Sequence, residues 1–133
     1  MYKRSVALLI AAAAALVSFA CGGVTSPSQN KQDTFSGTLA VGGITCFGNI
    51  SVPNSGEFSV KITALSPNAT AIVGTAWAQG GNCDLVVQQN NFSTLNTPAL
   101  AGAVLQKGTY SVAVYDVGAL TVAQNVTVVV SHP

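Results

Sequence analysis

The chain has 133 residues, of which 49% are hydrophobic and only 7% are charged, and its formal net charge is +1. Its only arginine, Arg4, lies near the N-terminus, so the rest of the chain is close to neutral. A surface that binds phosphate backbones needs clustered lysine and arginine. Nucleic acid is therefore a poor candidate partner, and solubility must depend on uncharged polar side chains.

The first 20 residues have the three parts of an export signal. Lys3 and Arg4 form the positive end, and an uninterrupted apolar segment runs from Val6 to Val17. Small residues then occupy the first and third positions before Cys21. The apolar segment is shorter than the ~20 residues that cross a bilayer core, which disfavours a permanent transmembrane helix.

The letters VSFAC, ending at Cys21, resemble the lipobox of bacterial lipoproteins. Ala20 and Cys21 match that pattern, whereas Ser18 and Phe19 depart from it. The resemblance implies that Cys21 is acylated and becomes the first residue of the mature chain. Ordinary cleavage before Cys21, giving a soluble secreted domain, is the alternative, because Ser18-Phe19-Ala20 is also a small-x-small site.

Residues 21–33 are rich in glycine, serine and polar side chains, a composition typical of a flexible spacer. We therefore expect a lipid-attached spacer at 21–33 and one folded domain at 34–133, a usual domain size. Gly22 replaces the aspartate that commonly signals retention at the inner membrane, so the lipoprotein resemblance implies outer-membrane sorting, facing the periplasm or the surface.

The three cysteines, Cys21, Cys46 and Cys83, are an odd number for an exported chain. If Cys21 carries lipid, Cys46 and Cys83 can form a disulfide in an oxidising compartment. Closing a loop of this length is worth about 4 kcal/mol in the chain-entropy model. We place Cys46 on the second strand and Cys83 at the start of the fifth, with the bridge running between two sheets. Two buried free thiols remain the alternative.

Beyond the spacer, apolar residues alternate with polar ones. In EFSVKITAL, from Glu57 to Leu65, Phe58, Val60 and Ile62 share one face, as in a half-buried strand. Similar segments are 35–41, 44–52, 71–78, 83–89, 109–117 and 125–131, whereas 99–105 is a strand or a turn of helix. Glycine- and proline-containing turns separate them. This spacing predicts an all-β fold: a single antiparallel β-sandwich of about seven or eight short strands.

The end of the chain, LQKGTYSVAVYDVGALTVAQNVTVVVSHP, resembles the end of bacterial pre-peptidase C-terminal type domains, which are jelly-roll-like β-sandwiches. The matching parts are GTYSVAVYD, the loop that follows it and the strand NVTVVV; the opening DTFSGTLAVGG also resembles that family's first strand. The resemblance carries no catalytic residues. It implies a role in targeting, secretion or substrate contact.

Catalysis has few candidate residues. The acidic side chains of the expected domain are Asp33, Glu57, Asp84 and Asp116, and each is most simply a solvated turn or strand-edge residue. His132 lies next to the last residue, where we expect fraying. Asp116 could contribute to a calcium site, but one carboxylate is not a site. We expect no catalytic residues, no metal and no cofactor.

Aromatic side chains are the better candidates for ligand contact, because sugar faces stack on exposed rings. The candidates are Trp77, Phe92, Tyr110 and Tyr115. Tyr110 and Tyr115 lie on opposite faces of a strand, and Trp77 is favoured as a core residue. We expect a non-catalytic binding or adhesion module for a glycan or an envelope protein, held at the membrane through the lipid. A purely structural envelope lipoprotein is the alternative.

Overall fold

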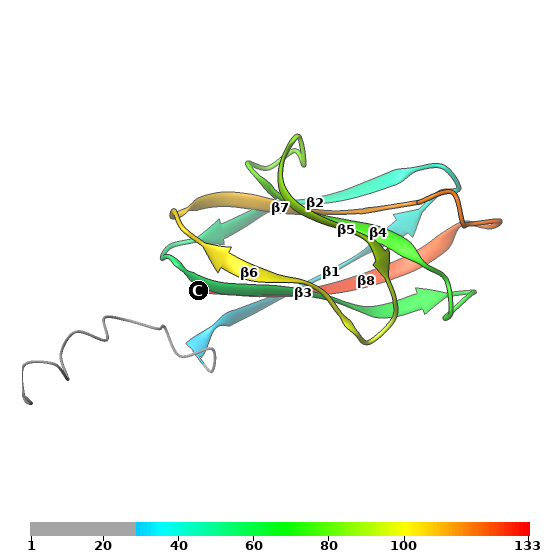
Figure 1. Ribbon diagram of the computed structural model, residues 1–133, viewed down its shortest axis with the longest axis horizontal. Helices are drawn as coiled ribbons and strands as arrows, with labels where there is room; N and C mark the ends of the chain where they lie inside the picture. The colour runs from blue at the N-terminus through cyan, green and yellow to red at the C-terminus, as the bar shows by residue number, and fades with distance from the viewer. Residues whose placement is uncertain (1–28) are drawn as a thin grey trace, which may run out of the picture.

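The computed structural model describes residues 29–133 as eight antiparallel β-strands in two layers (Figure 1). The strands are β1 (Lys31–Leu39), β2 (Ile44–Val52), β3 (Gly56–Ser66), β4 (Val73–Gln79), β5 (Leu85–Ser93), β6 (Pro98–Val104), β7 (Gly108–Tyr115) and β8 (Gln124–His132). One four-stranded sheet has the order β1-β8-β3-β6 and the other has the order β2-β7-β4-β5. The predicted β-sandwich is confirmed.

The core lies between the two sheets and follows the predicted alternation. In β3, the side chains of Phe58, Val60 and Ile62 are buried, and in β8 every second residue from Gln124 to His132 is buried. The segment that the sequence left open between strand and helix, Pro98–Val104, is the edge strand β6.

The folded part begins earlier than the sequence indicated. β1 starts at Lys31 and pairs along its whole length with β8, so it includes the last three residues assigned to the spacer. The side chain of Asn30 also donates a hydrogen bond to the Glu57 carbonyl oxygen, at 2.8 Å. The export signal and Cys21 lie outside the described residues. Within residues 29–133, no helix has the length and apolar character needed to span a bilayer.

The Cys46–Cys83 disulfide is present, which confirms the pairing. The expectation that it joins the two sheets is wrong, because Cys46 lies in β2 and Cys83 lies in the connection between β4 and β5, and all three strands belong to the sheet β2-β7-β4-β5. Cys46 lies opposite Ala113 of β7, which lies opposite Ala76 of β4. The bridge therefore crosses the outer face of β7, packed on these two alanines. Cys83 itself lies in the turn before β5, not within the strand.

The edge strands of the two sheets meet at the sides of the sandwich without a backbone ladder. On one side, the amide groups of Gln88 and Asn90 in β5 donate hydrogen bonds to the carbonyl oxygens of Ala101 and Ala99 in β6. We call this contact the amide seam. On the other side, β1 and β2 approach each other through the stacked rings of Phe35 and Phe47.

Candidate functional site

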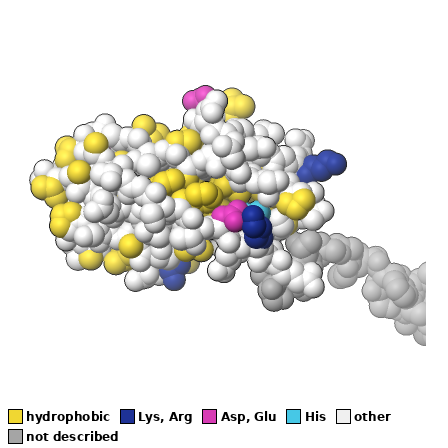
Figure 2. All heavy atoms as spheres, turned by 180° about the vertical axis from the view of Figure 1, so that it is seen from behind, with side chains coloured by type: hydrophobic (Ala, Val, Ile, Leu, Met, Phe, Trp, Pro, Cys, Tyr) yellow, Lys and Arg dark blue, Asp and Glu magenta, His cyan; other side chains and the backbone are white. Residues whose placement is uncertain are grey.

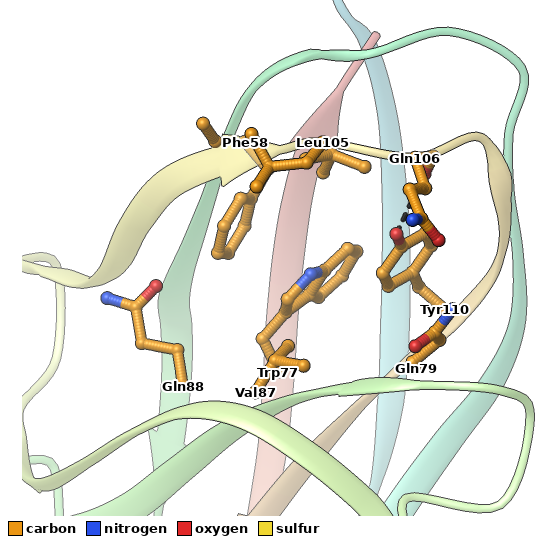
Figure 3. A pocket seen from close by; sticks show the side chains of 10 residues that line it. Phe58, Trp77, Gln79, Val87, Gln88, Leu105, Gln106 and Tyr110 are labelled. Carbon is orange, nitrogen blue, oxygen red and sulfur yellow. Dashed lines mark hydrogen bonds between the residues drawn. The ribbon is translucent and has the colours of Figure 1, made fainter.

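A hollow of about 310 Å³ opens beside the amide seam, where β4, β5 and β7 approach β6 (Figure 3). We call it the aromatic crevice. Its lining residues are Phe58, Trp77, Gln79, Val87, Gln88, Ala103, Val104, Leu105, Gln106 and Tyr110. None of these side chains is charged, so the crevice is electrically neutral.

Three aromatic rings form a column beside the crevice. The ring centroid of Trp77 lies 4.6 Å from that of Phe58 and 5.0 Å from that of Tyr110, with interplanar angles of 16° and 8°. Only 1% of Trp77 is exposed, and its two faces are covered by its neighbours. Tyr110 is also buried, and its hydroxyl donates to the Gln106 carbonyl oxygen at 2.8 Å. Neither Trp77 nor Tyr110 therefore offers a ring face on which a sugar could stack.

The edge of the Trp77 ring carries an unused donor. The indole Nε1–H can only donate a hydrogen bond, and it donates to no residue within 29–133. No side-chain nitrogen or oxygen of these residues is both sealed from solvent and without a partner, so the indole nitrogen lies at the margin of what solvent reaches, although only 1% of the whole residue is exposed. Solvent reaches this nitrogen through the crevice that Trp77 lines.

A second, shallower hollow of about 370 Å³ lies on the outer face of the sheet β2-β7-β4-β5, lined by Asn91, Phe92, Tyr115 and Val117. Here Phe92 is 78% exposed and Tyr115 is half-buried. The Tyr115 hydroxyl donates to Asn91 Oδ1 at 2.6 Å, and burial raises the pKa of Tyr115. These two rings, of the four predicted for ligand contact, remain on the surface.

Strand β5 carries a row of exposed apolar side chains. Leu85, Val86, Val87 and Phe92 are all exposed, and Leu85 reaches 65%. We call these four residues the β5 strip. An apolar side chain exposed by itself is ordinary, whereas three consecutive ones, Leu85 to Val87, are a candidate interaction site, and Phe92 lies further along β5, beyond the polar residues 88–91. β5 is also an edge strand, so a partner can approach it without meeting another strand of the same sheet.

Asp33 and His132 form a pair that the sequence analysis did not expect. The His132 side chain is fully buried rather than frayed, and its Nε2–H donates to Asp33 Oδ2 at 2.9 Å. Lys31 also contacts this carboxylate, at 2.9 Å. The hydrogen bond from His132, followed by that from Lys31, lowers the pKa of Asp33 against the opposing effect of burial. Acidic, basic and histidine side chains meet in one cluster on the face shown in Figure 2.

The other acidic residues have simpler roles. Asp116 Oδ1 accepts hydrogen bonds from the backbone N–H groups of Gly118, Ala119 and Leu120, and Oδ2 accepts one from Gly42. These bonds, led by that from Gly42, lower its pKa. Both oxygens are therefore engaged in shaping the turn. Glu57 and Asp84 are exposed. In residues 29–133, no three His, Cys, Asp or Glu side chains gather as metal ligands do.

No protein-family model matches the sequence, and no curated protein matches it significantly. Among solved structures, the fold is similar to that of PliG of Aeromonas hydrophila, a periplasmic inhibitor of g-type lysozyme. The two sequences are 13% identical, the TM-score is 0.53, and the match covers 78% of this chain and 88% of PliG. At this identity the likeness is one of fold. The lipobox and pre-peptidase resemblances stay predictions.

Proposed function

We propose that this chain is an exported, lipid-anchored and non-catalytic protein of the bacterial cell envelope, and that it binds another protein through the β5 strip. Cys21 carries the lipid, and the outer membrane is the proposed site. The observation that carries the proposal is the row of exposed Leu85, Val86, Val87 and Phe92 along an edge strand.

The composition of the surface favours a protein partner at this strip over a glycan. The strip is largely aliphatic, whereas glycan stacking needs accessible ring faces. Two of the four rings predicted for stacking, Trp77 and Tyr110, are buried. A protein interface, in contrast, forms where apolar side chains of two partners are desolvated together. The similarity to PliG supports this reading because that protein is a periplasmic protein inhibitor with the same kind of fold.

The strip is tested by site-specific photo-crosslinking in cells. A photoreactive residue at position 92 is expected to give a discrete protein adduct, whereas the same residue at Val41, which is also exposed but lies in a turn outside β5, gives none. A further substitution, Leu85→Asp, should abolish the adduct at position 92 by placing a charge in an apolar interface. Equal adducts at positions 92 and 41 would contradict a specific strip.

A g-type lysozyme is the first defined partner to assay with purified protein, by inhibition of its activity and by direct binding. Inhibition that Phe92→Asp removes identifies the partner class. Should no adduct form at any strip position, the purely structural envelope role takes the place of this proposal.

The lipid anchor is tested separately by metabolic labelling with a fatty-acid probe. The natural protein is expected to take up label and to sediment with membranes, and the Cys21→Ala form to do neither. Equal labelling of both forms would rule out acylation at Cys21, and an unlabelled natural protein in the soluble fraction would support ordinary secretion.

A further inference from the structure

We propose that the aromatic crevice binds an N-acetylated hexosamine unit of a neutral glycan, with the acetamido group directed at Trp77. This goes beyond the proposed protein-binding function, because the crevice and the β5 strip have only Val87 in common. This ligand matches three features of the crevice: the indole N–H of Trp77, the apolar side chains of its walls and the glutamine side chains at its rim.

The indole N–H of Trp77 favours a ligand with a neutral hydrogen-bond acceptor. Only 1% of Trp77 is exposed, and its Nε1–H donates to no residue within 29–133. The edges of the stacked rings carry partial positive charge, whereas their negative faces are covered. An oxygen with partial negative charge therefore fits this position. A full negative charge does not, because no lysine or arginine lines the crevice to compensate for its desolvation.

The apolar walls of the crevice favour a ligand with a methyl group and with the C–H face of a sugar ring. Val87, Val104 and Leu105 border the crevice, and Leu105 is 84% exposed at its mouth. An acetamido group combines a carbonyl oxygen with a methyl group, so it matches both the indole N–H and the apolar walls. Neither a simple hydroxyl nor a simple alkyl chain matches both.

The polar side chains at the rim of the crevice favour a ligand with several hydroxyl groups. Gln79, Gln88 and Gln106 stand around the ring column (Figure 3). Each side-chain amide has donors and an acceptor, which suits sugar hydroxyls that both donate and accept. A volume of about 310 Å³ lies at the lower end of the range for small-molecule sites, the size for one or two sugar rings.

The test uses the purified mature chain, Cys21–Pro133, and two trisaccharides with the same linkage. Triacetylchitotriose has an acetamido group on each ring, and cellotriose has a hydroxyl in its place. Trp77 is the only tryptophan of the chain, so its indole N–H resonance and its fluorescence report directly on the crevice. We expect saturable changes in both with triacetylchitotriose, and binding of cellotriose at least about tenfold weaker, the scale of one well-made polar contact.

The binding of triacetylchitotriose to three variants, measured by calorimetry, tests whether the crevice is the binding site. Trp77→Phe keeps an aromatic ring but removes the donor, and it should weaken triacetylchitotriose binding about tenfold. Leu105→Ala, at an exposed position that tolerates truncation, should weaken it severalfold. Leu85→Ala is the matched control, since Leu85 is also exposed but does not line the crevice. Equal affinity for both trisaccharides, or unchanged binding in Leu105→Ala, would overturn the proposal.

The two proposals can fail separately. Leu85→Asp should lose the protein adduct at position 92 and keep triacetylchitotriose binding, because Leu85 does not line the crevice. Leu105→Ala should do the reverse. Loss of both activities in either variant would contradict two separate sites.

Discussion

The side chain of His132 is fully buried although the residue is next to the last. The signal for this position was in the sequence: Val126, Val128 and Val130 alternate as buried residues of β8, and His132 continues the series. Its acceptor, Asp33, could not be identified in the same way. The two residues are 99 positions apart, and only the β1–β8 register brings them together.

Removing the acceptor tests this pair. Asp33→Ala leaves the buried His132 Nε2–H without its partner and should lower the free energy of unfolding by about 1–3 kcal/mol at pH 7. Urea denaturation of the variant and the natural chain measures the difference. Asp33→Asn, which keeps an acceptor oxygen, should lose less. A variant as stable as the natural chain would show that the bond contributes nothing.

The same difference should depend on pH in a defined direction. Because the pKa of Asp33 is lowered in the folded state, chiefly by the hydrogen bond from His132, its contribution is complete above the unfolded value of 3.8. It is lost as the pH falls through the lowered pKa of the folded state. The stabilities of Asp33→Ala and the natural chain should therefore converge below pH 3.8, as followed by thermal unfolding at stepped pH.

Gly74 is a second position at which a single residue determines the local packing. A β-carbon added there would overlap the Tyr115 ring, so the glycine allows that ring to cross β4 and reach Asn91. Gly74→Ala should cost about 1–3 kcal/mol of stability through overpacking. In a Tyr115→Ala background the same change should cost much less, and a double-mutant cycle measures this coupling. Additive effects would contradict it.

At the level of the strands, alternation predicted most of the fold. It did so because each sheet has one face on the core, which imposes a period of two on β3 and β8. It was indecisive for β6, whose sequence PALAGAV has small residues on both faces. The alternation also does not indicate which strands pair with one another in a sheet. The disulfide was therefore assigned to two sheets, when β2 and β4 in fact flank the same strand, β7.

The amide seam is an edge-strand feature with a testable role. Gln88 and Asn90 occupy the carbonyl oxygens that β6 would otherwise present to another strand. Replacing both by valine should free these oxygens and promote self-association, measured by light scattering and by sedimentation. Gln89→Val is the matched control, because Gln89 is exposed on the same strand and makes no bond in the seam. A monomeric double variant would show that other features protect the edge.

At the scale of the whole molecule, the candidate site was only partly predictable. Composition identified the rings and made nucleic acid a poor candidate partner, because these conclusions depend on residue counts. Which ring is covered on both faces, as Trp77 is, depends on packing between strands that are distant in sequence. Phe92 lies within the edge strand β5, where it is exposed.

The disulfide contributes to the stability of the entire domain. Its ends are 37 residues apart, so opening it should lower the free energy of unfolding by about 4 kcal/mol in the chain-entropy model. The Cys46→Ala, Cys83→Ala double variant is expected to show this loss in urea denaturation. Reductant should destabilise the natural protein to a similar extent and leave the double variant unchanged. A loss near zero would mean that the packing around Ala76 and Ala113 suffices without the bond.

The chain enters its fold beside the aromatic crevice. Asn30 is bonded to the Glu57 carbonyl oxygen, and a shallow hollow next to it shares Phe58 and Ala103 with the crevice lining. With Cys21 held in a bilayer as proposed, the end of the sandwich that carries the crevice is the end joined to the spacer. A glycan bound in the crevice would then lie at the end of the domain that the chain ties down, and the turn at Asp116 would be left free at the other end.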